Sequence, residues 1–286
     1  MELRFTKHHG SGNDFLVILQ PDEVVLGPDE VRALCDRHRG IGADGLIVGT
    51  YGTDGADLEM LLRNADGSLA EMSGNGIRCL VQAAVAAGMA TAGTVSVDTG
   101  GGRRQVEYRE ISEGLGYAEV DMGPVGVGDD LALDQPPAAL AGPAAVSRAC
   151  AVNVGNPHIV LLTGDIWPDV RAIGPAIECA VEGGVNVEIV RVCDGTSVDM
   201  DVWERGVGIT ESCGTGACAA AAAARSWGLV GDDIEVRSGG GALRVKLGPE
   251  GATLCGPTRV IGEVTVEVGV LSGLVAERRD EVVAAL

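Results

Sequence analysis

The sequence is poor in lysine, histidine and aromatic residues, and each shortage excludes a class of function. Only Lys7 and Lys246 are lysines, and neither lies in a phosphate-binding context, so we expect no pyridoxal phosphate on a Schiff-base lysine. The 4 histidines and 8 cysteines show no CxxC pair and no ligand spacing, so no metal is expected. Aromatic residues are only 3% of the chain, so the core should consist of Ala, Val, Leu and Ile.

Long apolar runs and an excess of positive charge are also missing. No segment approaches the roughly 20 apolar residues of a membrane-spanning helix, and the charged N-terminus MELRFTKHHG is not typical of a signal peptide. A net charge of −20 argues against nucleic acid and anionic membranes as partners, because both need Lys and Arg to neutralise phosphate. The composition is that of an ordinary soluble protein, which we expect to be cytoplasmic.

An internal duplication organises the 286 residues. Four blocks recur in the same order at an offset of 139–143 residues: 12–18 with 155–161, 42–48 with 184–190, 71–76 with 211–216, and 95–102 with 234–241. The 44 glycines could produce one such match by composition alone, but not four in register. Because the period is far too long for a solenoid, it indicates two homologous halves related by a pseudo-two-fold axis.

Each half shows short β patterns followed by one helix. The helices are expected to start after Ser73 and after Cys213, and to end at Gly88 and Gly228, which suit the position just beyond a helix. Neither helix has a clear polar face before its last turn, so each should be buried. The predicted class is α+β, with two pseudo-symmetric domains, each an antiparallel β-sheet or barrel wrapped around a central buried helix.

The sequence also suggests where the halves meet and where a ligand binds. We expect the active site in the cleft between the domains. The predicted boundaries are 1–114 for the N-terminal half, 115–269 for the C-terminal half, and a C-terminal segment 270–286 that returns to the first half.

Equivalent residues stand at the two helix starts. Ser73 aligns with Cys213, and each is followed by Gly at the first and third positions after it. Free N–H groups at two such helix ends are suited to binding a carboxylate. A Cys at a helix N-terminus has a thiol pKa lowered from about 8.5, so we expect Cys213 to act as a base. Abstraction of an α-proton, followed by protonation on the opposite face, inverts an amino acid.

Six segments resemble the diaminopimelate epimerase family. They are KHHGSGNDFLVI, RHRGIGADGLIV, RNADGSLAEMSGNGIRC, VNVGNPHIVLL, ERGVGITESCGTGACA and a terminal GEVTVE stretch, in the family's order over most of the chain. The resemblance implies an isomerase that epimerises LL- and meso-diaminopimelate at Cα, in the pathway to lysine and cell-wall precursors. It also implies that the enzyme uses neither metal nor pyridoxal phosphate, binds a small amino-acid substrate and forms a homodimer.

The resemblance implies roles for individual residues. Cys213 and the residue at position 73 form the acid/base pair, and His158 and Glu204 assist them. The implied substrate-binding residues are Asn13, Asn64, Gly74, Asn75, Asn156, Asn186, Glu204, Arg205, Gly214 and Thr215. In the duplication Asn13 pairs with Asn156, and Asn64 pairs with Glu204.

Ser73 departs from the family pattern, which has Cys at this position. A serine hydroxyl is a far weaker acid than a thiol. Three explanations stay open: an engineered Cys-to-Ser variant, a natural epimerase whose serine donates a proton, or a relative with different chemistry. The third includes a racemase, dehydratase or eliminase for another amino acid, as in the related proline racemase group. A silenced, ligand-binding fold is the non-enzymatic alternative.

One further motif is discounted. The segment 40–45 fits GxGxxG literally, but it leads into the apolar strand pattern LIVGTY and opens no helix. It therefore does not predict a dinucleotide site.

Overall fold

The computed structural model describes residues 1–19, 26–136 and 145–284. Contacts divide the chain into two units. The first comprises Met1–Gly10, Asp14–Ala118 and Pro257–Leu286, and the second comprises Ser11–Asn13 and Glu119–Gly256. The sequence placed the boundary at 114/115 and returned only 270–286 to the first half. The contact grouping places it at 118/119 and returns the chain from Pro257 onward.

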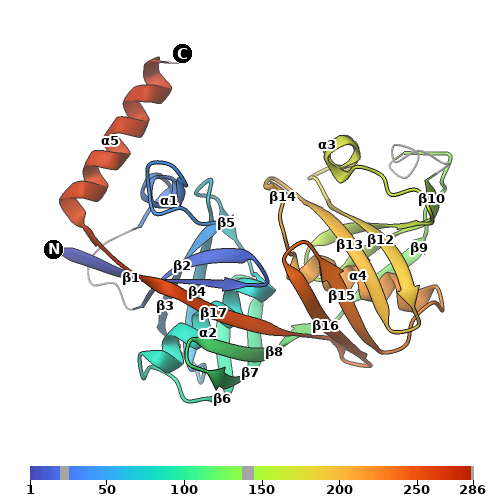
Figure 1. The fold of residues 1–286 in the computed structure, drawn as a ribbon, viewed down its shortest axis with the longest axis horizontal. Coiled ribbons are helices and arrows are strands. Elements are labelled where there is room, and N and C mark those ends of the chain that lie inside the picture. The colour runs from blue at the N-terminus through green and yellow to red at the C-terminus, as the bar shows by residue number, and fades with distance from the viewer. Residues whose placement is uncertain (20–25, 137–144, 285–286) are drawn as a thin grey trace. The chain divides into compact units, whose positions relative to one another are not determined.

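Among the described residues, the first unit combines seven strands with three helices, and the first residue of one of these strands, Asn13, is grouped with the second unit (Figure 1). The strands are β1 (Glu2–Gly10), β2 (Asn13–Leu19), β3 (Gly45–Tyr51), β4 (Leu58–Asn64), β5 (Leu69–Ala70), β6 (Gly93–Thr99) and β7 (Gly102–Ser112). The helices are α1 (Pro28–Cys35), α2 (Gly74–Ala86) and α5 (Val268–Ala284). Two long strands contribute residues to both units: β8 (Leu115–Gly123) and β17 (Gly251–Glu267).

The second unit repeats the same order of elements. Its strands are β9 (Gly126–Asp130), β10 (Val146–Asn153), β11 (Pro157–Thr163), β12 (Asn186–Asp194), β13 (Ser197–Glu204), β14 (Gly208–Ile209), β15 (Asp233–Ser238) and β16 (Gly241–Gly248). Its helices are α3 (Val170–Ala180) and α4 (Gly214–Ser226). The predicted class, α+β with two pseudo-symmetric domains, is confirmed.

The sheets contain parallel as well as antiparallel strand pairs, whereas the sequence predicted antiparallel pairs only. In the first unit β2 pairs with β3, and β4 with β6, in parallel. In the second unit β11 pairs with β12, and β13 with β15, in the same sense. Parallel neighbours need a crossover connection. Helices α1 and α3, which the sequence analysis missed, form the crossovers between β2 and β3 and between β11 and β12.

The two central helices confirm the sequence prediction most closely. Helices α2 and α4 each have 13 residues, and nearly all side chains in their first three turns are buried. Each is followed by a glycine with positive φ, 74° at Gly88 and 73° at Gly228. Alanine dominates α4, so strands β9–β13, β15 and β16 can pack closely around it. These helices form the centre of their units and present equivalent N-termini.

Strand register corrects one alignment within the duplication. The sequence matched 42–48 with 184–190, an offset of 142. In the structure Gly45 pairs with both Phe15 and Asn64. In the second unit Asn186 pairs with His158, the counterpart of Phe15, so Asn186 is the counterpart of Gly45. The true offset there is one residue smaller, so Ile47 is the counterpart of Glu188. The glycine contacts agree, because a Cβ on Gly76 would meet Ile47 and a Cβ on Gly216 would meet Glu188.

Helix α5 packs against α1 and closes a second hydrophobic cluster in the first unit. Leu271 and Val275 are buried there beside Val31 and Leu34 of α1. Arg278 forms an ion pair with Asp36 at 2.5 Å. Within the described part of the chain, no helix combines the length and apolarity needed to cross a membrane.

A charged cluster fastens the start of β2 to the loop before β3. The nearly buried Asp14 accepts hydrogen bonds from Arg37 at 2.6 and 3.1 Å and lies 3.0 Å from Lys7. Burial alone raises the pKa of Asp14, but the hydrogen bonds from Arg37 and Lys7 outweigh it and leave the pKa below its usual value. The backbone N–H groups of Asp14 and Asp44 each donate to the other carboxylate at 3.1 Å.

Replacing Asp14 with Asn should lower the free energy of unfolding by about 2 kcal/mol, because Lys7 loses its charged partner and Arg37 keeps only Asp44. The exposed pair Arg103–Asp98 is the control, and Asp98→Asn should lower the free energy of unfolding much less than Asp14→Asn. Because the folded pKa of Asp14 is depressed, its contribution is present above the unfolded pKa and is lost as pH falls. Urea titrations of both variants at neutral and acidic pH check this, and equal losses for the two variants would contradict it.

Candidate active site

Cys213 caps the N-terminus of α4. Its backbone is extended, and its sulfur accepts a hydrogen bond from the N–H of Gly216 at 3.3 Å. The sulfur also lies 3.4 Å from the hydroxyl of Thr215, and the residue is 6% exposed. A Cβ on Gly216 would lie 3.3 Å from this sulfur and 2.8 Å from Glu188 Oε1. Only glycine leaves room at that point for both groups.

Ser73 caps α2 in the same way. Its hydroxyl oxygen accepts from the N–H of Gly76 at 3.1 Å, with a backbone conformation close to that of Cys213. Gly74 and Asn75 are buried at this tip, and the side chain of Arg78 donates to Gly74 O and to Asn75 Oδ1. Each unit, taken by itself, therefore has the predicted cap geometry at the start of its central helix.

A polar chain leads away from the tip of α4. The amide nitrogen of Asn156 lies 3.4 Å from Thr215 Oγ1, and its Oδ1 lies 2.9 Å from His158 Nε2. The other ring nitrogen of His158, Nδ1, lies 2.7 Å from Glu188 Oε1. The side chains of His158 and Glu188 are both fully buried. The structure thus links three residues named from the sequence, Asn156, His158 and Thr215, to the cap residue Cys213.

Glu204 and Asn186 lie at the ends of paired strands in the same unit. Glu204 ends β13, accepts a short hydrogen bond from Thr210 and interacts with the Cys213 thiol. Asn186 begins β12, donates to Pro157 O at 2.9 Å and accepts the N–H of Arg205 at 2.9 Å. The exposed Arg205 guanidinium lies 3.2 Å from Gly183 O.

The protonation of Cys213 differs from the sequence expectation. Burial raises the pKa of the Cys213 thiol well above its ordinary value, and the charges of Glu204 and Glu188 raise it further. The Thr215 hydroxyl and the Gly216 N–H act in the opposite direction but do not prevail. The expectation of a lowered pKa was wrong because it counted the helix end but neither the burial of the thiol nor the neighbouring carboxylates. Burial also raises the pKa of Glu204, which makes that carboxylate a better proton acceptor.

The remaining predicted residues are placed as follows. Asn64 ends β4 and donates to Ser68 Oγ at 3.1 Å, in the turn that joins β4 to β5. Asn13 lies in the segment Ser11–Asn13, which is grouped with the second unit by its contacts. A Cβ on its neighbour Gly12 would meet the Glu211 carboxylate at 2.5 Å, so this turn packs closely on the segment before Cys213.

Sequence reasoning missed Glu188. It lies within the strand pattern VNVEIVRV, and the residues on either side of it are apolar and buried. Such a pattern does not predict a carboxylate that contacts a histidine. The available signal was a lone Glu where the duplicated strand, GLIVGTY, has only apolar and small residues.

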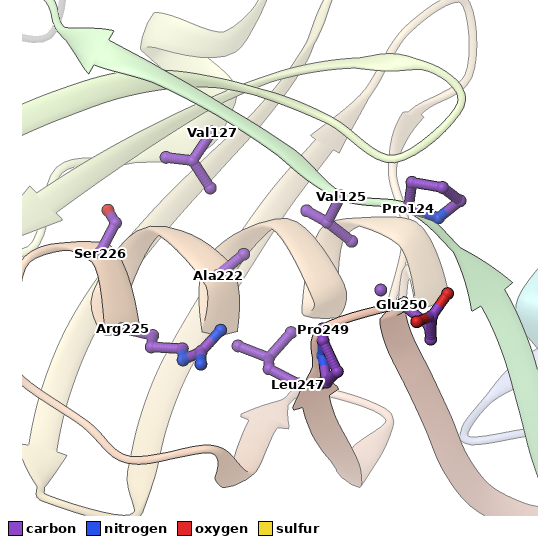
Figure 2. Close-up of a pocket in the computed structure, with 11 residues that line it drawn as sticks. Pro124, Val125, Val127, Ala222, Arg225, Ser226, Leu247, Pro249 and Glu250 are labelled. Atoms are coloured by element: carbon purple, nitrogen blue, oxygen red, sulfur yellow. The ribbon is translucent and has the colours of Figure 1, made fainter.

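Figure 2 shows a separate pocket in the second unit, of about 410 Å³, beside the C-terminal half of α4. Ala222, Arg225 and Ser226 line it from the helix, at the end remote from Cys213, and Glu250 lines it from the β16–β17 turn. None of the residues lining it was predicted as a site residue. In the described ranges, no group of three or more His, Cys, Asp or Glu side chains is arranged to hold a metal ion.

The chain matches the family model described as "Diaminopimelate epimerase" over residues 5–127 and 150–266. It is 36% identical to the diaminopimelate epimerase of Rhodococcus jostii over 94% of this chain and 99% of that protein. It is 39% identical to that of Methanothrix thermoacetophila over 95% of this chain and 96% of that one.

Solved structures share the fold at low sequence identity. A phenazine biosynthesis protein of the PhzF family from Bacillus anthracis superposes with a TM-score of 0.72 at 12% identity, covering 94% of this chain and all of that one. A probable proline racemase from Agrobacterium radiobacter superposes with a TM-score of 0.69 at 18% identity, covering 93% of each chain.

Proposed function

Because the chain belongs to the diaminopimelate epimerase family, we propose that it interconverts LL- and meso-diaminopimelate by moving a proton at Cα. The observation that carries the proposal is the pair of equivalent helix tips, one capped by Ser73 and the other by Cys213. The first backbone N–H groups of a helix have no acceptor within the helix, and they suit a carboxylate.

Cys213 is the proposed base. The raised thiol pKa means that the free enzyme holds its proton, which must leave before the sulfur can attack a C–H bond. Glu204 interacts with this thiol and has a raised pKa of its own, so it is the proposed acceptor. The thiolate then takes the α-proton, and the electron pair of the C–H bond spreads onto the substrate carboxylate.

The helix ends stabilise the charge that develops on that carboxylate. Their N–H groups and dipoles are fixed before the reaction, so they need no reorganisation when charge appears. Gly74 and Asn75 supply these groups at α2, and Gly214 and Thr215 supply them at α4. The proposed substrate-binding side chains are Asn13, Asn64, Asn156, Asn186, Glu204 and Arg205.

Ser73 is the proposed group that returns a proton on the opposite face of Cα. At the places where the second unit has His158, Glu188 and Glu204, the first unit has Phe15, Ile47 and Asn64. When Ser73 protonates the carbanion it becomes an alkoxide, and none of these three side chains can return a proton to it as the Glu204 carboxyl can to the Cys213 thiolate. We therefore propose that protonation by Ser73 is the slower of the two steps, and that His158 supports the Cys213 side.

Composition and family support the remaining features that we propose. The enzyme works without pyridoxal phosphate or metal, acts in the cytoplasm in the pathway to lysine, and forms a homodimer. The small amino-acid substrate is its partner, and the strong negative charge disfavours nucleic acid and membranes.

The direct test is chiral separation of diaminopimelate isomers after incubation with the purified chain. Conversion of LL- to meso-diaminopimelate, with a chelator present and no added pyridoxal phosphate, is the expected result. If the chain turned over only another amino acid, such as a proline derivative, the result would contradict this function and support the alternative racemase. Release of water from a β-hydroxy substrate would indicate the eliminase.

A further inference from the structure

Glu188 is a buried carboxylate to which the proposed mechanism gives no step. It lies on β12 among buried Val and Ile side chains. Its Oε1 contacts His158 Nδ1, and its Oε2 is buried with no hydrogen-bond partner among the described residues. The first unit builds the same strand with Ile47, so the fold itself does not require a carboxylate here. A carboxylate that is ionised in such surroundings needs a cation beside it.

His158 is the group that can supply that cation. Nδ1 faces the Glu188 carboxylate at 2.7 Å, and Nε2 faces the Asn156 carbonyl oxygen at 2.9 Å. An ionised carboxylate and an amide oxygen only accept, so with Glu188 ionised both ring nitrogens must carry hydrogen. A neutral imidazole has one N–H, whereas an imidazolium has two.

We infer that Glu188 is a positioning residue that holds His158 as an imidazolium, whose Nε2–H in turn fixes the amide orientation of Asn156. With its oxygen held by the ring, Asn156 directs its NH₂ group toward Thr215 at the tip of α4. That NH₂ group is a donor placed beside Cys213, where the substrate carboxylate is proposed to bind. The inference rests on the proposed function for this last step alone.

The opposite arrangement shows why the charge matters. A neutral ring with hydrogen on Nδ1 would present a bare Nε2, which accepts but cannot donate. Asn156 would then turn its NH₂ toward the ring and its oxygen toward the α4 tip, where it would repel a carboxylate. Loss of the charge at Glu188 is therefore expected to weaken substrate binding more than it slows the proton transfers.

The first unit contains a matched histidine. His8 is 1% exposed, and its ring nitrogens lie 2.9 Å from Gln82 Oε1 and 2.9 Å from Thr6 Oγ1. Both partners are uncharged, and burial lowers the pKa of His8. One chain thus holds two buried histidines that differ in the charge of the Nδ1 partner, and His8 is the neutral reference.

The experiment is nitrogen NMR of the full chain labelled at histidine, at neutral pH. The native spectrum should show the signature of an imidazolium for His158 and of a neutral ring for His8. In Glu188→Gln, which keeps an oxygen acceptor but removes its charge, His158 should become neutral like His8. KM for diaminopimelate should rise about ten- to a hundredfold, with a smaller change in kcat.

A neutral His158 in the native chain would overturn the inference, as would a Glu188→Gln variant that keeps both the imidazolium and the native KM. An unchanged His8 signal shows that the variant is folded. If Glu188→Gln does not fold, Asn156→Ala replaces it: His158 should stay charged while KM rises, and an unchanged KM would count against the inference. The NMR result needs no substrate, so a charged His158 in a chain that never epimerises diaminopimelate would refute the proposed function alone.

Discussion

Cys213→Ala should lower the rate of α-proton exchange from diaminopimelate by about a thousandfold, the usual contribution of a general base. The substitution removes the sulfur proposed to take the proton and leaves helix α4 buried as before. The measurement is the initial rate of solvent deuterium incorporation at Cα, followed by proton NMR in heavy water.

Cys218→Ala is the matched control. Cys218 lies on the same helix and is fully buried. Its replacement creates a small cavity and should cost about 1 kcal/mol of stability with little change in rate. Equal rate losses in the two variants would show that helix packing, and not the sulfur of Cys213, limits the reaction.

Ser73→Cys should raise the rate of epimerisation by about a hundredfold. A thiol is a much stronger acid than a hydroxyl, so proton return should cease to be the slow step. The cap geometry can be kept, because Cys213 already forms the same cap with sulfur at the equivalent position. The readout is kcat for LL- to meso-diaminopimelate conversion, measured in both directions.

Ser73→Ala separates the cap from the chemistry. It removes the acceptor for the Gly76 N–H and should cost about 1 kcal/mol of stability, as loss of a helix cap does. It should also abolish inversion. If Ser73→Cys leaves the rate unchanged, or Ser73→Ala retains native inversion, position 73 does not carry the second proton transfer.

The sequence was most informative where a pattern repeats. The duplication predicted both central helices because the Gly, cap and apolar signals recur in each half, and Gly88 and Gly228 end them as expected. It could not predict the strand register near Asn186, because apolar strands match almost equally well when shifted by one residue. The crossover helices α1 and α3 were missed because they are short, with 8 and 11 residues, and give few turns of helical periodicity.

The site was harder to predict than the fold because its chemistry depends on burial. Cys213, His158 and Thr215 could be found from motifs, and the structure links them. The raised pKa of Cys213 could not be found, because it arises from burial and from the carboxylates of Glu204 and Glu188, which only the fold brings close to the thiol. Glu188 was missed for the same reason. Its role depends on His158, which is 30 residues away in the sequence and is brought close by the pairing of β11 with β12.

The central claim is that Cys213 removes the α-proton of diaminopimelate and that a group on the opposite face returns one. It is tested most directly by incubating the native chain with the LL and the meso isomer, separately, in heavy water. Deuterium should appear at Cα of the inverted product from either isomer. Absence of deuterium from both isomers and both products would contradict the account.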